Sequence, residues 1–443
     1  MGGNSWFYGI DRLIFAENLV TYNSNTKQFM KRYIFQMAMI GAVAMGVVSC
    51  SNEDPSLLNA KPYVPVTLTR GEGAVAQQCG DFAWHLFANV ESANAGKNVA
   101  MSPASAAMSL SMLANGAVAE TRQEIIGALG FGELDIDDVN SYTQKVTSQL
   151  VDIDNTAVLN ISNGLFVKGD AVLDSYKTLL SESYSAQVST FNTPSEGIAM
   201  INSWSLNATK GLLSAPNFRM DENTRGVVTN GMYFEGKWMS PFYKSDTDKR
   251  EFNNADGTKS KIDFMNKKAD MGIAGNEIFT LLEMPFGNGA FNFIGILPDE
   301  GHSVSECAEW MKGNSLWSVS ERLTFKNVDV SIPKFENKDL VVDLMPALLA
   351  MGIKRLFVAG ACQLDAMTPS GMNGVKVDFM SQSNYFKIDE NGAKAATVTT
   401  THVSGIGANV MQVAEMVFDR PFIYLIYEKS TKAVLFMGKV EKL

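Results

Sequence analysis

Glu390-Asn391-Gly392-Ala393-Lys394-Ala395-Ala396-Thr397-Val398-Thr399-Thr400-Thr401 is the stretch of this 443-residue chain that is most informative about its fold. It follows an apparent strand that ends at Asp389. Because strand side chains alternate with a period of two, one face carries only small side chains, those of Ala393, Ala395, Thr397, Thr399 and Thr401. The other face carries Lys394, Val398 and His402, which can face solvent. No proline occurs between Gly392 and Pro421, so the stretch can join a sheet as a strand, although by itself it also fits an ordinary threonine-rich edge strand or loop.

Other blocks along the chain resolve this ambiguity. They are residues 98–105 (NVAMSPAS), 112–117 (MLANGA), 201–204 (INSW), 230–238 (NGMYFEGKW), 297–301 (LPDEG), 333–335 (PKF), 420–424 (RPFIY) and 435–440 (LFMGKV). In this order the blocks resemble the serpins, the serine protease inhibitor family, from about residue 75 to residue 443. The stretch from Glu390 to Ala396 resembles the hinge of the serpin reactive loop, whose usual form is acid-x-Gly-small-acid-Ala-Ala.

The periodicity of apolar residues predicts both helices and strands. Helical spacing occurs in residues 81–90, 104–114, 121–129 and 339–351, and strand-like runs occur in residues 157–168, 226–234, 291–297, 418–427 and 433–440. This mixture is typical of the α+β class. The resemblance implies a serpin fold with three β-sheets, about nine helices and an exposed reactive-centre loop between Gly392 and Phe418.

Composition excludes several classes of function. The chain is 46% hydrophobic and carries a formal charge of -10, which argues against a nucleic-acid partner because phosphate binding needs a basic face. Besides Cys50, the cysteines are Cys79, Cys307 and Cys362, without CxxC spacing, so neither a metal site nor a disulfide framework is indicated. We expect these three to be small buried side chains, and we expect no cofactor.

The N-terminal residues resemble a bacterial lipoprotein leader. A basic pair at Lys31 and Arg32 precedes an apolar run, residues 34–48, that is too short for a comfortable membrane span. Val47-Val48-Ser49-Cys50 resembles a lipobox, which predicts a signal peptide over residues 30–49 and a lipid on Cys50. Residues 1–29 are interpreted as a gene-start artefact or an extension, residues 50–74 as a lipidated tether, and residues 75–443 as the serpin domain. This organisation predicts a monomer anchored to the bacterial outer membrane or cell surface, on the extracellular or periplasmic side.

The sequence shows no signature of an enzyme. It has three histidines, His85, His302 and His402, and no Gly-x-Ser-x-Gly elbow, His-Glu-x-x-His pair or phosphate-binding loop. We therefore predict that the chain is not an enzyme and has neither catalytic residues nor a metal site.

The resemblance instead implies inhibition by being cut. A target protease attacks the reactive loop, and the cleaved loop inserts into the main sheet before the acyl-enzyme is released. The hinge residues implied are Glu390, Gly392, Ala393, Lys394, Ala395, Ala396 and Thr397. Lys394 departs from the family's usual acid, but it falls on the outward face, where we expect little penalty.

A second set of residues corresponds to the place where the loop enters. Trp238 matches the aromatic residue at the top of the main sheet, and Ser102, Ser105 and Asn230 match the polar cluster beneath its opening. The family often adds a histidine to this cluster, and by spacing that position is Gln382, whose amide can donate and accept hydrogen bonds similarly.

Family spacing from Gly392 puts the reactive bond at Ile406–Gly407, with Val410 and Met411 as alternatives because the loop is longer than the commonest form. All three candidate side chains are apolar, which favours elastase-like serine proteases as partners, with papain-like cysteine proteases as a second class. Two rival interpretations are a non-inhibitory serpin that acts as a binding module on the cell surface and an adhesin-like structural lipoprotein.

Overall fold

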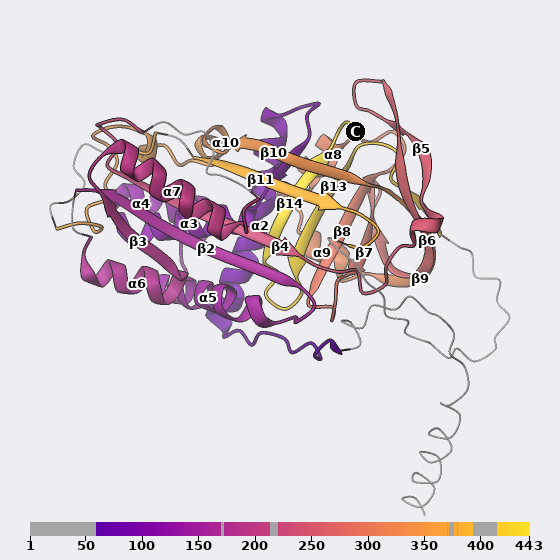
Figure 1. Cartoon of the computed structure of the whole chain (residues 1–443), viewed down its shortest axis with the longest axis horizontal. Coiled ribbons are helices and arrows are strands. Elements are labelled where there is room, and N and C mark those ends of the chain that lie inside the picture. The colour runs from indigo at the N-terminus through magenta and orange to yellow at the C-terminus, as the bar shows by residue number, and fades with distance from the viewer. Residues whose placement is uncertain are drawn as a thin grey trace, which may run out of the picture. The chain divides into compact units, whose positions relative to one another are not determined.

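The computed structural model of the chain describes residues 59–169, 172–212, 220–369, 371, 376–378, 380–392 and 414–443. Figure 1 shows the helices and strands of this part. Its nine α-helices are α2 (Arg70–Ala93), α3 (Pro103–Gly116), α4 (Ala119–Ala128), α5 (Ile136–Gln149), α6 (Asp174–Tyr184), α7 (Pro194–Ala208), α8 (Val304–Gly313), α9 (Leu316–Ser320) and α10 (Met345–Ala350). Three short 3-10 helices are η2 (Leu150–Asp152), η3 (Lys244–Asp246) and η4 (Arg355–Phe357).

The strands of the described residues form three sheets. Their bounds are β1 (Val99–Met101), β2 (Val158–Lys168), β3 (Ala186–Phe191), β4 (Gly226–Glu235), β5 (Asp248–Asn253), β6 (Lys259–Gly275), β7 (Phe279–Pro285), β8 (Phe291–Pro298), β9 (Thr324–Pro333), β10 (Phe335–Asp343), β11 (Ser381–Ile388), β12 (Ala414–Val417), β13 (Phe422–Glu428) and β14 (Val434–Val440). One sheet has the order β1-β14-β13-β8-β7-β6-β9-β12 with β5 on β6, the second is β3-β2-β4, and the third is β10-β11. The predicted α+β class, with three sheets and about nine helices, is confirmed.

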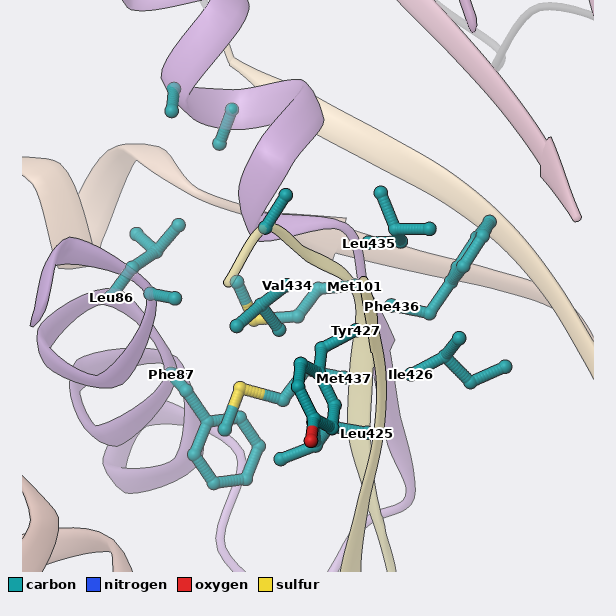
Figure 2. Packing of buried hydrophobic residues seen from close by; sticks show 14 of the residues in the cluster. Leu86, Phe87, Met101, Leu425, Ile426, Tyr427, Val434, Leu435, Phe436 and Met437 are labelled. Atoms are coloured by element: carbon teal, nitrogen blue, oxygen red, sulfur yellow. The ribbon is translucent and has the colours of Figure 1, made fainter. Parts of the chain in front are cut away.

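The main core lies where α2 packs against the C-terminal strands. Every residue of β13 and β14 is buried, as expected for continuous apolar runs. Figure 2 shows Phe87 of α2 among Leu425, Tyr427 and Met437 of these strands. The helix begins with a capping box, in which the Thr69 hydroxyl accepts from the Glu72 N–H and the Glu72 carboxylate accepts from the Thr69 N–H. The capped helix α2 therefore packs against the C-terminal strands as part of one core.

A smaller core lies where α7 crosses the face of β2 and β4 (Figure 1). The Trp204 ring of α7 packs edge-on against Phe166 of β2, with ring centroids 6.3 Å apart. Gly231 of β4 lies beneath the helix, where an added Cβ would come within 2.7 Å of the Ala208 Cβ. This glycine lets α7 lie close to the sheet.

One predicted helix is wrong in its first half. Residues 339–351 show helical spacing, but β10 continues to Asp343 and the helix α10 begins only at Met345. Val341 and Val342 favour the strand because they are β-branched, and they pair with Ser383 and Gln382 of β11. The helix that begins at Met345 has Pro346 in its first turn, where proline is common.

Two predicted boundaries differ in the structure: the one where the loop ends and the one where the tether meets the folded domain. The expected loop ends before Phe418, because residues 414–417 form β12, which pairs in parallel with β9. At the other end, residues 70–74 already belong to α2, and the Tyr63 hydroxyl donates to Glu428 at 3.1 Å. The packed domain therefore includes residues that the sequence analysis assigned to the tether. Within the part of the chain that the structure describes, no helix is long and apolar enough to cross a membrane.

Candidate functional site

A slot lies between β4 and β11, which run as neighbours in Figure 1. Among the described residues, β4 pairs only with β2, and β11 pairs only with β10, so each strand leaves one edge without a ladder partner. A cavity of about 770 Å³ occupies this space and is lined by Val228, Asn230 and Met232 of β4, Gln382 and Asn384 of β11, and Ser105 of α3. Two facing strand edges with a cavity between them can accept one more strand.

The floor of the slot is the N-terminus of α3. Ser102 is the N-cap of this helix, and its hydroxyl accepts from the Ser105 N–H at 3.2 Å. The Gln382 side chain bonds the backbone of Ser102 twice: its oxygen accepts from the Ser102 N–H at 2.9 Å, and its nitrogen donates to the Ser102 carbonyl at 2.8 Å. The Gln382 amide thereby joins the floor of the slot to β11.

The opposite wall is held by a separate chain of amides. The Asn230 Nδ2 donates to the Asn163 Oδ1 of β2 at 2.7 Å, and the Asn163 Nδ2 donates to the Tyr184 carbonyl, also at 2.7 Å. The Ser102 hydroxyl lies 3.6 Å from the sulfur of Met232 in β4. Ser102, Ser105, Asn230 and Gln382 therefore line one cavity, but Asn230 and Gln382 belong to different hydrogen-bond groups on its two sides.

A tight turn at residues 389–392 closes the top of β11. The Asp389 N–H donates to the Gly392 carbonyl and the Gly392 N–H donates to the Asp389 carbonyl, both at 3.0 Å. Gly392 has φ +102°, a region that side chains with a Cβ rarely adopt. An added Cβ would also lie 2.5 Å from the backbone nitrogen of Trp238. A residue with a side chain would be strained at this position, so the turn requires glycine.

Trp238 fastens this turn to the end of β4. The indole is buried, and its Nε1 donates to the Asp389 carbonyl at 3.1 Å. The ring stacks on Phe286 with centroids 4.5 Å apart and an interplanar angle of 11°. Trp238 therefore packs as a core aromatic and also bonds the turn at residues 389–392.

Glu390 ties the same turn to two distant elements. Its carboxylate lies 3.0 Å from the Lys334 Nζ and accepts from the Thr247 hydroxyl at 2.9 Å. Burial raises the pKa of Glu390, but its own backbone N–H, Lys334 and Thr247 outweigh burial by hydrogen bonding, so the pKa lies below the usual value. The sequence analysis assigned no role to Lys334 or Thr247. The only sequence feature that points to either residue is that Lys334 lies in one of the blocks quoted above, residues 333–335.

The remaining predicted site residues lie outside the described residues. They are the hinge residues Ala393, Lys394, Ala395, Ala396 and Thr397, the reactive-bond residues Ile406, Gly407, Val410 and Met411, and the lipidation residue Cys50.

The described residues offer no metal site, since they contain no group of three or more histidine, cysteine or acidic side chains that could hold an ion. His302 lies 3.6 Å from Glu306 in a helix-capping turn, and the His85 Nε2 lies 2.9 Å from the Lys312 carbonyl. Cys307 and Cys362 are buried, and Cys79 is half-buried, with burial raising the pKa of its thiol to about 12.

Comparison with known proteins identifies the same family over most of the chain. Residues 77–443 match the family model Serpin (serine protease inhibitor). Iripin-3 of Ixodes ricinus is 29% identical over 366 residues, which cover 79% of this chain and 90% of that protein. Human glia-derived nexin is 25% identical, with 78% of this chain and 88% of that protein covered.

Solved structures share the fold. The thermophilic serpin tengpin in its native state superposes with a TM-score of 0.75 at 24% identity, covering 86% of this chain and 98% of that one. Human thyroxine-binding globulin in complex with thyroxine has a TM-score of 0.74 at 25% identity, covering 84% of this chain and 99% of that one.

Proposed function

Because this chain belongs to the serpin family, we propose that it is a covalent suicide inhibitor of serine endopeptidases, with elastase-like enzymes as preferred targets and papain-like cysteine proteases as a second class. The family is one of protease inhibitors rather than catalysts, and proteases in general are its partners. The observation that carries the proposal is the slot between β4 and β11, which no strand of the described residues occupies, with Gly392 bridging to Lys237 and Asp389 at one end.

The proposed reaction begins as ordinary proteolysis. The serine hydroxyl of the protease attacks the carbonyl carbon of Ile406, and the bond to the Gly407 nitrogen breaks as the histidine of the protease protonates that nitrogen. Residue 406 is then an ester on the protease serine. A papain-like enzyme would form a thioester in the same way.

Trapping follows when the cut loop enters the slot before water can reach the ester. About a dozen residues would gain strand pairing, and at roughly 0.5–1.5 kcal/mol for each hydrogen bond the gain is on the order of 5–20 kcal/mol. That rivals the total stability of a domain, so it can drive displacement of the attached protease. The small inward side chains from Ala393 to Thr401 support this step because they present little bulk to the core.

The choice of target protease follows from the reactive bond. Ile406, Val410 and Met411 are all apolar, and no lysine or arginine occurs between Ala395 and Arg420. An aliphatic residue suits an elastase-like pocket, whereas a trypsin-like pocket needs a cation.

The test is to mix the purified protein with neutrophil-type elastase, and separately with chymotrypsin and a papain-like enzyme, on a denaturing gel. A band at the summed mass that survives boiling is expected with elastase, and mass spectrometry of the released peptide would locate the reactive bond. Cleavage by all three enzymes without any such band would overturn the proposal.

A second candidate function is a non-inhibitory binding module at the cell surface. This function is supported by the similarity to thyroxine-binding globulin, a serpin solved with a bound small molecule. The two functions differ in their response to loop cleavage: an inhibitor should gain a large increment in melting temperature, whereas a module that does not insert its loop should gain none.

We also propose that the protein is a monomer held at the bacterial outer membrane or cell surface by a lipid on Cys50. The support is the lipobox-like sequence that ends at Cys50 and the polar residues that follow it. Cys50→Ala should abolish labelling by a fatty-acid probe and release the protein from the membrane fraction; unchanged labelling would exclude this anchor.

A further inference from the structure

The residues before α2 are bonded to the domain as an N-terminal strap (residues 59–69). The Asn288 Nδ2 donates to the Lys61 carbonyl at 3.2 Å, and the Val66 N–H donates to the Ser430 hydroxyl at 3.0 Å. These bonds hold the strap on the loop between β7 and β8 and on the turn between β13 and β14. In Figure 1 the strap is the indigo segment along the lower edge. Its backbone is therefore held in place, which limits the directions in which its side chains can point.

The strap exposes a short apolar stretch to solvent. Val66 is buried, but Val64 is 71% exposed, and the nearby Pro62 and Pro65 are exposed as well. The bonds made by the backbone at Lys61 and Val66 keep Val64 from turning inward. A single exposed valine is ordinary on a protein surface, so its meaning depends on the charges beside it.

Two lysines border this stretch. Lys61 and Lys429 are both exposed. They lie close together because both are bonded to the same loop between β7 and β8. The Asn288 side chain of this loop reaches the Lys61 carbonyl, and the Lys429 N–H donates to the Ala290 carbonyl at 2.9 Å. The surface around Val64 therefore presents two cations to solvent, on a chain whose formal charge is -10.

The acids beneath the strap do not cancel these cations by direct contact. The first half of the strap is bonded by three turns, residues 152–156, 287–290 and 428–432, which contain three acids. Glu428 is 0% exposed and Asp154 is 2% exposed, and their carboxylates accept hydrogen bonds from nearby N–H and hydroxyl groups. Asp152 is the exposed acid of the three. An anionic surface that approaches Val64 therefore meets more positive than negative side chains.

The length of chain before the strap limits where a lipid can lie. Cys50 precedes Asn59 by nine residues, which span at most about 30 Å when fully extended. A domain of this length is roughly 50 Å across. A lipid on Cys50 would therefore keep the strap, rather than the opposite side of the domain, next to the membrane.

We propose, building on the proposed lipid at Cys50, that Lys61, Val64 and Lys429 form a strap surface that docks on anionic lipid headgroups. The two ammonium groups bind headgroup phosphates, and the Val64 side chain enters the boundary between headgroups and acyl chains. A cationic patch of this kind adds to the membrane affinity that an acyl anchor supplies. The tether alone leaves the domain free to rotate, whereas this contact fixes which face is turned toward the membrane.

The experiment supplies the anchor chemically. The chain from residue 50 onward, which keeps every described residue, is coupled through the Cys50 thiol to maleimide-bearing lipid in vesicles. The other thiols, those of Cys79, Cys307 and Cys362, are half-buried or buried, and mass spectrometry verifies that only Cys50 is coupled. The vesicles contain phosphatidylcholine alone or phosphatidylcholine and phosphatidylglycerol in equal parts. A membrane-impermeant amine reagent then labels accessible lysines, and each site is quantified by peptide mass spectrometry.

Labelling of Lys61 and Lys429 should fall roughly fivefold on the anionic vesicles, the change expected for one cation in contact with an anionic surface. Lys326 on β9 is also exposed and is the matched control, so its labelling should not change. Val64→Asp should restore labelling of the two lysines, whereas Val358→Asp, at another exposed valine, should not. Salt at about 1 M should restore labelling as well, because it shortens the Debye length to about 3 Å.

Equal labelling of Lys61 and Lys429 on anionic vesicles, on neutral vesicles and in the uncoupled protein would overturn the proposal. Equal protection of Lys326 would overturn it too, because the domain would then have no preferred face. The assay does not depend on whether cells lipidate Cys50, since the coupling provides the anchor. Failure of the anchor itself would appear instead as a lack of fatty-acid labelling of the wild type in cells.

Discussion

The Lys334 ammonium lies 3.0 Å from the Glu390 carboxylate and joins the start of β10 to the turn at residues 389–392. The carboxylate is almost fully buried, while Lys334 remains partly exposed. A second lysine, Lys387, lies 3.1 Å from Asp389 in the same turn, but its side chain is 43% exposed. One turn therefore carries a shielded ion pair and a more solvated one, which allows their contributions to be compared.

Removing the shielded cation should destabilise the uncut protein. Lys334→Met leaves the buried Glu390 carboxylate without its ion-pair partner, at a cost of about 1–3 kcal/mol. Lys387→Met is the control and should cost less than about 1 kcal/mol, because water screens an exposed pair. Urea unfolding of the uncut protein measures both, and equal costs would show that Lys334 has no special role in holding the turn.

Acid should weaken the attachment of α2. Burial raises the pKa of the Glu72 carboxyl, but hydrogen bonds from Lys145, Ser141 and the Thr69 N–H outweigh burial and lower it to about 2. A folded-state pKa below the unfolded value means that the stabilisation is complete above about pH 4.5 and is lost as the pH falls toward 2. The free energy of unfolding of the wild type should exceed that of Glu72→Gln at pH 7 by on the order of 1–3 kcal/mol. This difference should shrink between pH 4.5 and pH 2; a difference that is constant with pH would contradict the assignment.

A large charged side chain on the inward face of the hinge should turn the inhibitor into a substrate. Ala393→Arg places a guanidinium on the face of the hinge that carries only small side chains in the sequence, where the charge would have to be buried on insertion. On a denaturing gel with elastase, this variant should be cleaved with almost no covalent complex. Lys394→Arg, one position along on the outward face, is the matched control and should still form the complex. Equal trapping by both variants would show that the face assignment is wrong.

The specificity of the reactive bond should change with one residue. Ile406→Arg offers the cation that a trypsin-like pocket needs, so trypsin should be trapped in a covalent complex that the wild type does not form. Val410→Arg and Met411→Arg are parallel variants for the two alternative positions. The variant that traps trypsin identifies the bond by mass spectrometry of the released peptide, and a complex formed only by one of the alternatives would move the bond from Ile406.

The fold and much of the candidate site were predictable because their signals are local. The buried strands β13 and β14 are recognisable in the sequence as continuous apolar runs, and so is the alternation of small residues after Gly392. The helix predicted over residues 339–351 is wrong in its first half because the apolar spacing of the whole segment fits a helix. The strand over its first half depends on pairing with β11, which a local pattern does not contain.

What the sequence determined by itself is which residues are small, which backbone position needs glycine and which family the blocks resemble, since each is a property of a short segment. Only the tertiary structure decided which groups meet. Lys334 and Thr247 reach Glu390 from 56 and 143 residues away. Asn230 and Asn384 face the same cavity from strands that share no ladder in the described part of the chain. Such contacts arise from packing rather than from spacing along the chain. A hydrogen bond depends on distance in space, so the sequence of one segment does not show which distant residue will be its partner.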